Sequence, residues 1–228
     1  MNLFDPLSHA LAIIVAAAHG GLTSLGLDPS SGLTWTLSIA AVVVTVRVAL
    51  LPAVAHGVRV AHGRARSLGC LPALIQLPFW IALYHLVSQA AGGAPVGALD
   101  AALVASLGAA TVLGVPLAGR GYLGAGPTHL AVVAALAGTA ALLSYVTQRF
   151  VVAPNLVLDG VPEAVVRTQQ YLPVLSGVGL LVASAFAPAA LIVYWVLNSS
   201  WTLAQSTVVV CWFPTPGSAA ALRQQGRM

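Results

Sequence analysis

Charged residues are scarce in this 228-residue chain, and lysine is absent. Only 6% of the residues are charged, whereas 59% are hydrophobic, and the mean hydropathy is +0.94. Soluble domains carry about 25% charged residues, so the composition excludes that class and indicates a polytopic membrane protein. All nine basic residues are arginines, and they form no dense run. We therefore expect no nucleic-acid partner.

Signatures of catalysis and metal binding are also missing. The two cysteines, Cys70 and Cys211, fall beside segments that we place in the cytoplasm, so no disulfide is predicted. The six histidines form no H-x-x-x-H or H-E-x-x-H pair, and no G-x-S-x-G occurs. His129 and Ser144, a conceivable protease pair, lie about four turns apart on one helix. We predict a protein that is not an enzyme and has no metal or cofactor.

Five apolar segments are long enough to span a bilayer, which requires about 20 residues. Lipid offers no hydrogen-bond partner to the backbone, so such segments must be helical. The predicted fold is an all-α bundle of five transmembrane helices forming the core 33–211, with spans at 33–55, 70–90, 129–150, 171–187 and 188–211.

Arginines assign an orientation to this bundle. Seven of them fall on one side of the predicted membrane, and only Arg120 falls on the other. Because basic residues concentrate in cytoplasmic loops, the N-terminus is predicted outside and the C-terminus in the cytoplasm. The seven are Arg59, Arg64, Arg66, Arg149, Arg167, Arg223 and Arg227.

The segments outside the spans are assigned by length and polarity. The apolar run 7–18 is only 12 residues long, so 1–32 is predicted to be an interfacial segment. The stretch 91–128 is predicted to form an external hairpin, because inserting it would reverse the side on which the later arginines lie. Residues 212–228 are predicted to form a cytoplasmic tail.

Arg47 lies alone near the middle of the first span. A charge at that depth costs about 2.5–3.5 kcal/mol on insertion scales, so we expect it to face a hydrated cavity or a partner. Thr36 and Ala40 share its predicted face. On the last span a polar stripe recurs at helical spacing, formed by Tyr194, Asn198, Trp201 and Gln205. Together these faces predict a polar groove.

Two plainer interpretations stand beside the groove. A polar stripe on a membrane helix serves more often as a contact between helices than as a conduit. The Arg47 side chain could also extend to the inner interface and act as an anchor.

Three stretches carry a resemblance to a known family. Residues from Gly69 read GCLPALIQLPFWIALY, those from Thr45 read TVRVALLP, and those from Ala187 read APAALIVYWVLN. The first resembles the G-C-L-P-x-L-x-Q-x-P-x-x-x-A-L-Y pattern of the YidC membrane protein insertases, which include the Oxa-type proteins. The other two resemble that family's T-x-x-R-x-x-L-x-P and P-A-G-L-x-x-Y-W-x-x-N. The similarity extends over about residues 32–205.

The resemblance implies an insertase of the bacterial plasma membrane, which moves hydrophobic segments of new proteins from the cytoplasm into the bilayer. Arg47 matches the family's groove arginine, and Gln148, Trp201 and Gln76 are assigned to the same groove. The expected partners are nascent membrane proteins and lipid. The resemblance does not decide whether the ribosome or the Sec translocon is also a partner.

The chain departs from this family in two places. A cytoplasmic hairpin of several dozen residues is replaced by what we expect to be a short linker, 55–69, and the tail lacks a lysine-rich extension. An alternative is therefore a scaffold or chaperone paralogue without insertase activity. A small transporter is another, although the spans show no internal repeat.

Overall fold

The computed structural model describes the backbone of residues 5–64, 71–122, 124 and 126–226, with their side chains apart from 5, 61–77 and 80. This part of the chain is mostly helical, as predicted, and its strands are two short ones, β1 (Thr111–Val112) and β2 (Val115–Pro116). The long helices are α1 (Asp5–Ser24), α2 (Gly32–Ala49), α3 (Leu51–Arg64), α4 (Leu71–Ala91), α6 (Gly126–Val146), α7 (Glu163–Ser184) and α8 (Ala189–Trp212).

Among the described residues, three helices are long and apolar enough to cross a membrane. They are Pro6–Ser24, Gly32–Ala49 and Gly126–Asn155. The first was predicted as a 12-residue interfacial helix and is longer than that, because α1 continues through small and polar residues to Ser24. The fourth and fifth predicted spans correspond to α7 and α8, which have 22 and 24 residues but include polar side chains.

The first predicted span differs from the structure at its end. Pro52 has no N–H to donate to the carbonyl of Val48, and α2 ends at Ala49. The backbone nevertheless continues almost directly into α3, since the Val54 N–H donates to the Leu50 carbonyl at 3.1 Å. The first part of the expected linker 55–69 is helical, up to Arg64.

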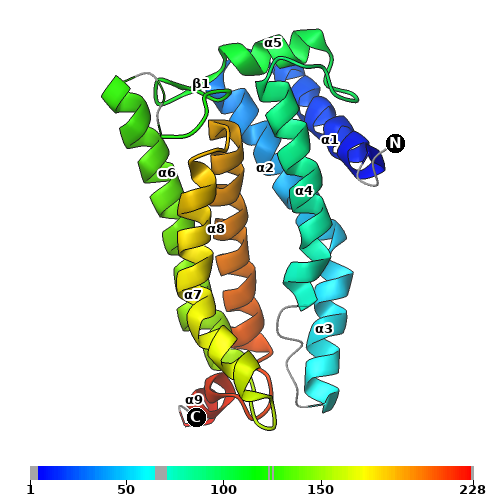
Figure 1. Ribbon diagram of the computed structural model, residues 1–228. Helices are drawn as coiled ribbons and strands as arrows, with labels where there is room; N and C mark the ends of the chain where they lie inside the picture. Colours follow the sequence, from blue (N-terminus) through cyan, green and yellow to red (C-terminus); the bar gives the residue numbers. More distant parts are fainter. Residues whose placement is uncertain (1–4, 65–70, 123, 125, 227–228) are drawn as a thin grey trace.

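The helices form two groups that lie side by side (Figure 1). Helices α1, α2 and α4 pack together in one group, and α6, α7 and α8 pack together in the other. The main connection between the groups is the contact of α2 with α8. A site between α2 and α8 thus lies in the middle of the molecule.

One end of the bundle is covered by residues 92–122, which include the short helix α5 (Ala101–Ala109) and the β1–β2 hairpin (Figure 1). The Trp35 indole N–H donates to the Ser106 hydroxyl at 3.0 Å, and Ser106 donates to the Pro29 carbonyl at 2.5 Å. The Arg120 guanidinium donates to the Ser88 carbonyl at 2.7 Å, which ties this cover to α4. These contacts close that end of the bundle.

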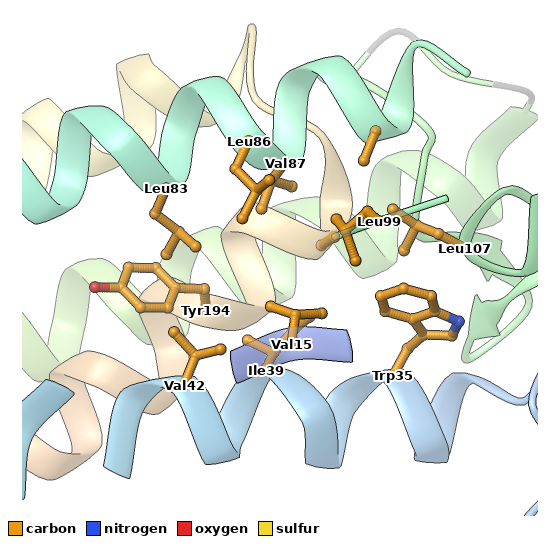
Figure 2. Close-up of a pocket in the computed structure, with 12 residues that line it drawn as sticks. Val15, Trp35, Ile39, Val42, Leu83, Leu86, Val87, Leu99, Leu107 and Tyr194 are labelled. Carbon is orange, nitrogen blue, oxygen red and sulfur yellow. The ribbon is translucent and has the colours of Figure 1, made fainter. Parts of the chain in front are cut away.

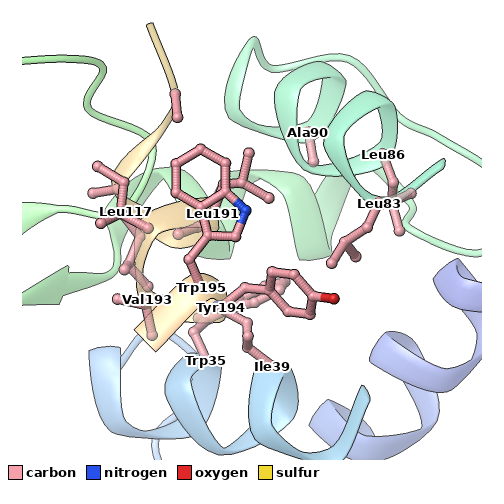
Figure 3. Packing of buried hydrophobic residues seen from close by; sticks show 14 of the residues in the cluster. Trp35, Ile39, Leu83, Leu86, Ala90, Leu117, Leu191, Val193, Tyr194 and Trp195 are labelled. Carbon is pink, nitrogen blue, oxygen red and sulfur yellow. The ribbon is translucent and has the colours of Figure 1, made fainter. Parts of the chain in front are cut away.

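Apolar packing continues inward from the covered end. Figure 3 shows Leu117 of the cover beside Leu191 and Trp195 of α8, while Tyr194 points toward Leu83 of α4. All five side chains are buried. Near the cover, the region between the two helix groups is therefore packed with apolar side chains.

The opposite end is formed by α3, by the start of α7 and by the tail. After α8 the chain folds back into α9 (Ala219–Gln225). The Asn155 side-chain oxygen accepts the Thr215 N–H at 2.8 Å and faces the Ser218 hydroxyl at 3.4 Å. These contacts attach the tail to the helical segment that follows α6.

Candidate functional site

Arg47 projects from α2 onto α8, and its side chain is only 7% exposed. Its Nε and Nη2 both donate to the Asn198 side-chain oxygen, at 3.2 and 2.8 Å, and Nη2 also donates to the Thr202 hydroxyl. Such a buried guanidinium requires acceptors, because an unpaired buried charge is strongly unfavourable. Arg47 therefore joins the two helix groups. It does not extend to the edge of the bundle, as the anchor interpretation required.

Thr202 is the residue that sequence reasoning missed. It follows Asn198 by four positions, so the two side chains lie on the same face of α8. Its hydroxyl proton is donated to the Asn198 backbone carbonyl at 2.7 Å, which turns an oxygen lone pair toward Arg47. The i, i+4 spacing from Asn198 was the available signal.

Tyr194 lies one turn of α8 from Asn198, toward the covered end, and is 7% exposed. Its ring lines a cavity of about 30 Å³ that is otherwise bordered by apolar side chains, including Trp35 and Leu86 (Figure 2). The hydroxyl points away from Trp35. Apolar walls offer water few hydrogen-bond partners, so we expect this cavity to be dry.

Small residues were expected on α2 between Arg47 and the covered end, and this is only partly so. Thr36 and Ala40 are half-buried, but Val42 and Val43 are the residues nearest the charge that are fully buried on this helix. Thr34 and Ser38, one turn apart on α2, are also fully buried.

A second and larger cavity opens on the other side of Arg47. It has a volume of about 820 Å³ and lies between α3 and the second half of α8. Trp201 and Gln205 stand on its wall, and the Trp201 indole N–H donates to the Gln205 side-chain oxygen at 2.9 Å. The remaining lining residues are Leu51, Val54, Ala55, Val58, Arg59, Ala204, Val208, Val209 and Phe213.

This cavity is amphipathic. Its walls are mainly aliphatic and aromatic, while exposed Arg59 and half-buried Gln205 supply polar groups. Arg47 and Asn198 are not among the residues that line it. The predicted stripe on α8 thus divides in two: Asn198 contacts Arg47, and Trp201 with Gln205 faces the cavity.

The two glutamines assigned from the resemblance lie on other helical segments than Arg47. Gln148 is half-buried in a π-helical turn, η1 (Thr147–Val152), that follows α6. π-Helical turns are rare and occur frequently at functional sites. Gln76 lies on α4, but its side chain is outside the described residues.

No cluster with the character of a metal site is found in the described part of the chain, where no three His, Cys, Asp or Glu side chains gather. The chemistry available to Arg47, Asn198, Trp201 and Gln205 is hydrogen bonding, electrostatic attraction and apolar contact. Such a set can bind and orient a chain segment.

Comparison with known proteins identifies relatives of the chain. A family model described as 60Kd inner membrane protein matches residues 61–214, more than half of the chain. A membrane protein insertase YidC of Streptomyces avermitilis is 33% identical over 160 residues, covering 66% of this chain and 37% of the relative. YidC insertases of Bifidobacterium longum and Tropheryma whipplei are 26% and 22% identical, over 69% and 96% of this chain and 49% and 87% of their own lengths. No solved structure matches the chain.

The chain spans less than half the length of the first two of these relatives. The family model covers Asn198, Thr202 and the motif from Gly69, and it begins after Arg47. These matches confirm the resemblance drawn from the three sequence motifs, and the chain belongs to the 60Kd inner membrane protein family, the family of the YidC membrane protein insertases.

Proposed function

We propose that this protein is a membrane protein insertase that transfers hydrophobic segments of newly made proteins from the cytoplasm into the bilayer. The observation that carries the proposal is the position of Arg47. A buried guanidinium, held by Asn198 and Thr202, lies between the covered end of the bundle and a cavity of about 820 Å³. Fixed charge beside an amphipathic cavity suits a client that has an apolar segment and a polar tail.

Orientation in the membrane follows from the charges at the two ends. Arg59, Arg167 and Arg223 lie at the end formed by α3, the start of α7 and the tail, whereas Arg120 lies in the cover. Because cytoplasmic loops are enriched in arginine, we place the α3 end in the cytoplasm of a bacterial cell and the cover outside. A client would then enter the cavity from the cytoplasm.

The proposed mechanism requires no catalytic group. The apolar segment of the client packs against Val208, Phe213 and Trp201 while its polar tail approaches Arg47. An acidic tail would gain charge-assisted hydrogen bonds at a depth where water is scarce. The segment then partitions into lipid, and its burial in hydrocarbon drives the transfer at about 0.5 kcal/mol for each leucine.

Photo-crosslinking tests this proposal against a scaffold or a transporter. A photoreactive residue replaces Ala204, which lines the cavity, and the matched control replaces Val174, which is 56% exposed on α7. Ribosome-bound chains with one apolar segment are then synthesised in the presence of membranes. An insertase gives adducts to the nascent chain from position 204 and few from position 174. Equal labelling from both positions, or adducts to other membrane proteins alone, would contradict the proposal.

A further inference from the structure

Two side-chain oxygens hold Arg47, and a client carboxylate would supply the same number. We propose that Asn198 and Thr202 occupy the client-binding edge of Arg47 and yield it selectively to acidic tails, which makes them specificity-determining residues. This inference rests on the insertase function proposed above. It adds that the charge is already occupied before a client arrives.

The geometry defines which edge of the guanidinium is occupied. Nε and Nη2 form one side of the planar group, and both donate to the Asn198 oxygen. Nη2 donates in addition to the Thr202 hydroxyl. Two oxygens from neutral side chains thus lie along the edge that a carboxylate would engage with its own two oxygens.

The proposal requires that a client carboxylate bind Arg47 more strongly than the neutral side chains of Asn198 and Thr202 do. The bonds from the Arg47 guanidinium to the neutral Asn198 and Thr202 oxygens are already charge-assisted, and a carboxylate adds to such bonds the attraction between opposite charges. A carboxylate can therefore displace Asn198 and Thr202, whereas a neutral amide of a client offers no advantage over the amide already present. Selectivity for acidic tails is the difference in free energy between the exchange with a carboxylate and the exchange with a neutral amide.

We infer that the client tail moves along α8 from the larger cavity to Arg47. Trp201 is adjacent to Thr202 in the chain and stands on the wall of the cavity, where it is bonded to Gln205. Arg47 does not line the cavity. In the proposed exchange the tail passes Trp201 and Gln205, which line the cavity, before it reaches the guanidinium.

Two substitutions at this site should act in opposite directions. Asn198→Asp places a permanent carboxylate on Arg47 and should make the guanidinium unavailable to the client. Thr202→Val keeps the shape of the side chain but removes one acceptor, so Arg47 should be released more easily. A role confined to holding the helices together predicts no such opposition.

The test uses the purified full-length chain in proteoliposomes and two single-span clients that differ only in two tail residues, Asp or Asn. Asn198→Asp should lower insertion of the acidic client about tenfold relative to the neutral one, a change that corresponds to about 1.4 kcal/mol. Thr202→Val should raise the ratio of acidic to neutral insertion at least twofold. Asn155→Asp is the matched control, since it makes the same change at the tail attachment, where Asn155 also acts as an acceptor.

Each outcome has one meaning. The inference is overturned if Asn198→Asp lowers insertion of both clients equally or of neither, or if Thr202→Val leaves the ratio unchanged. Failure of the wild-type protein to insert either client would instead refute the insertase function. Thermal unfolding in detergent accompanies every variant, and if Asn198→Asp does not fold, the Thr202→Val ratio decides.

Discussion

Arg47 and Asn198 are separated by 151 residues in the chain, yet one side-chain oxygen of Asn198 accepts two N–H groups of Arg47, at 3.2 and 2.8 Å. The pair joins α2 to α8 and so connects the two groups of helices. It lies between apolar packing at the covered end and a cavity at the other. This position makes it both a structural contact and the natural centre of the proposed function.

Removing the Asn198 amide should destabilise the protein. In Asn198→Ala the guanidinium stays buried and loses two of the three hydrogen bonds that the described residues give it, so we expect a loss of about 1–2 kcal/mol in the free energy of unfolding. Reversible unfolding in mixed micelles measures the change. Thr139→Ala serves as the control, because the Thr139 hydroxyl donates only to the Ala135 carbonyl of its own helix and is exposed. Equal effects of the two substitutions would show that the Arg47 contact contributes little.

Filling the larger cavity should block insertion without loss of stability. Ala204 is exposed on its wall, so the indole of Ala204→Trp can occupy space that a client requires. We expect client insertion to fall at least about fivefold, a change equivalent to about 1 kcal/mol, while the melting temperature changes little. Val174→Trp places the same side chain on the exposed face of α7 and should leave insertion intact. Normal insertion by Ala204→Trp would exclude the cavity from the client's path.

The covered end should be sensitive to a single methyl group. A Cβ atom at Gly32 would lie 1.9 Å from the Thr111 carbonyl oxygen, so Gly32→Ala must displace the backbone of β1. We expect a loss of about 1–3 kcal/mol, in the range of overpacking in cores. Gly138→Ala is the control, because a Cβ atom there meets nothing within 4 Å and alanine favours the helix by about 0.5–1 kcal/mol. Equal melting temperatures for the two variants would show that the cover is not closely packed against α2.

The helical class could be predicted from the sequence, as could Arg47 and Asn198 as separate candidate residues, but their contact with each other was not predicted. Lipid leaves few options for long apolar runs, and an arginine within one of them requires a partner, which directed attention to Arg47 and to the polar face of α8. The spacing of Asn198 within that face was enough to name it. Thr202 was missed because threonine on a membrane helix usually bonds to its own backbone, which it also does here.

Features that depend on three-dimensional packing could not be predicted from the sequence. Helical spacing assigned Thr36 and Ala40 to the face of Arg47, whereas Val42 and Val43 are fully buried, because the neighbouring helices determine which face of α2 is covered. The π-helical turn at Gln148 depends on the fit of α6 to its neighbours rather than on local preference. The break at Leu50 was not predicted, since 33–55 was interpreted as one span, although Pro52 lacks the N–H that would continue the helix.

Substitution of Arg47 in cells depleted of their own insertase tests the central claim most directly. Membrane insertion of a single-span client with an acidic tail is measured by protease protection, with the wild-type chain, Arg47→Lys or Arg47→Ala supplied in equal amounts. We predict that the wild-type chain restores insertion and that lysine, which keeps the charge but not the planar edge, retains more activity than alanine. Failure of the wild-type chain to restore insertion, or full activity of Arg47→Ala, would contradict the account.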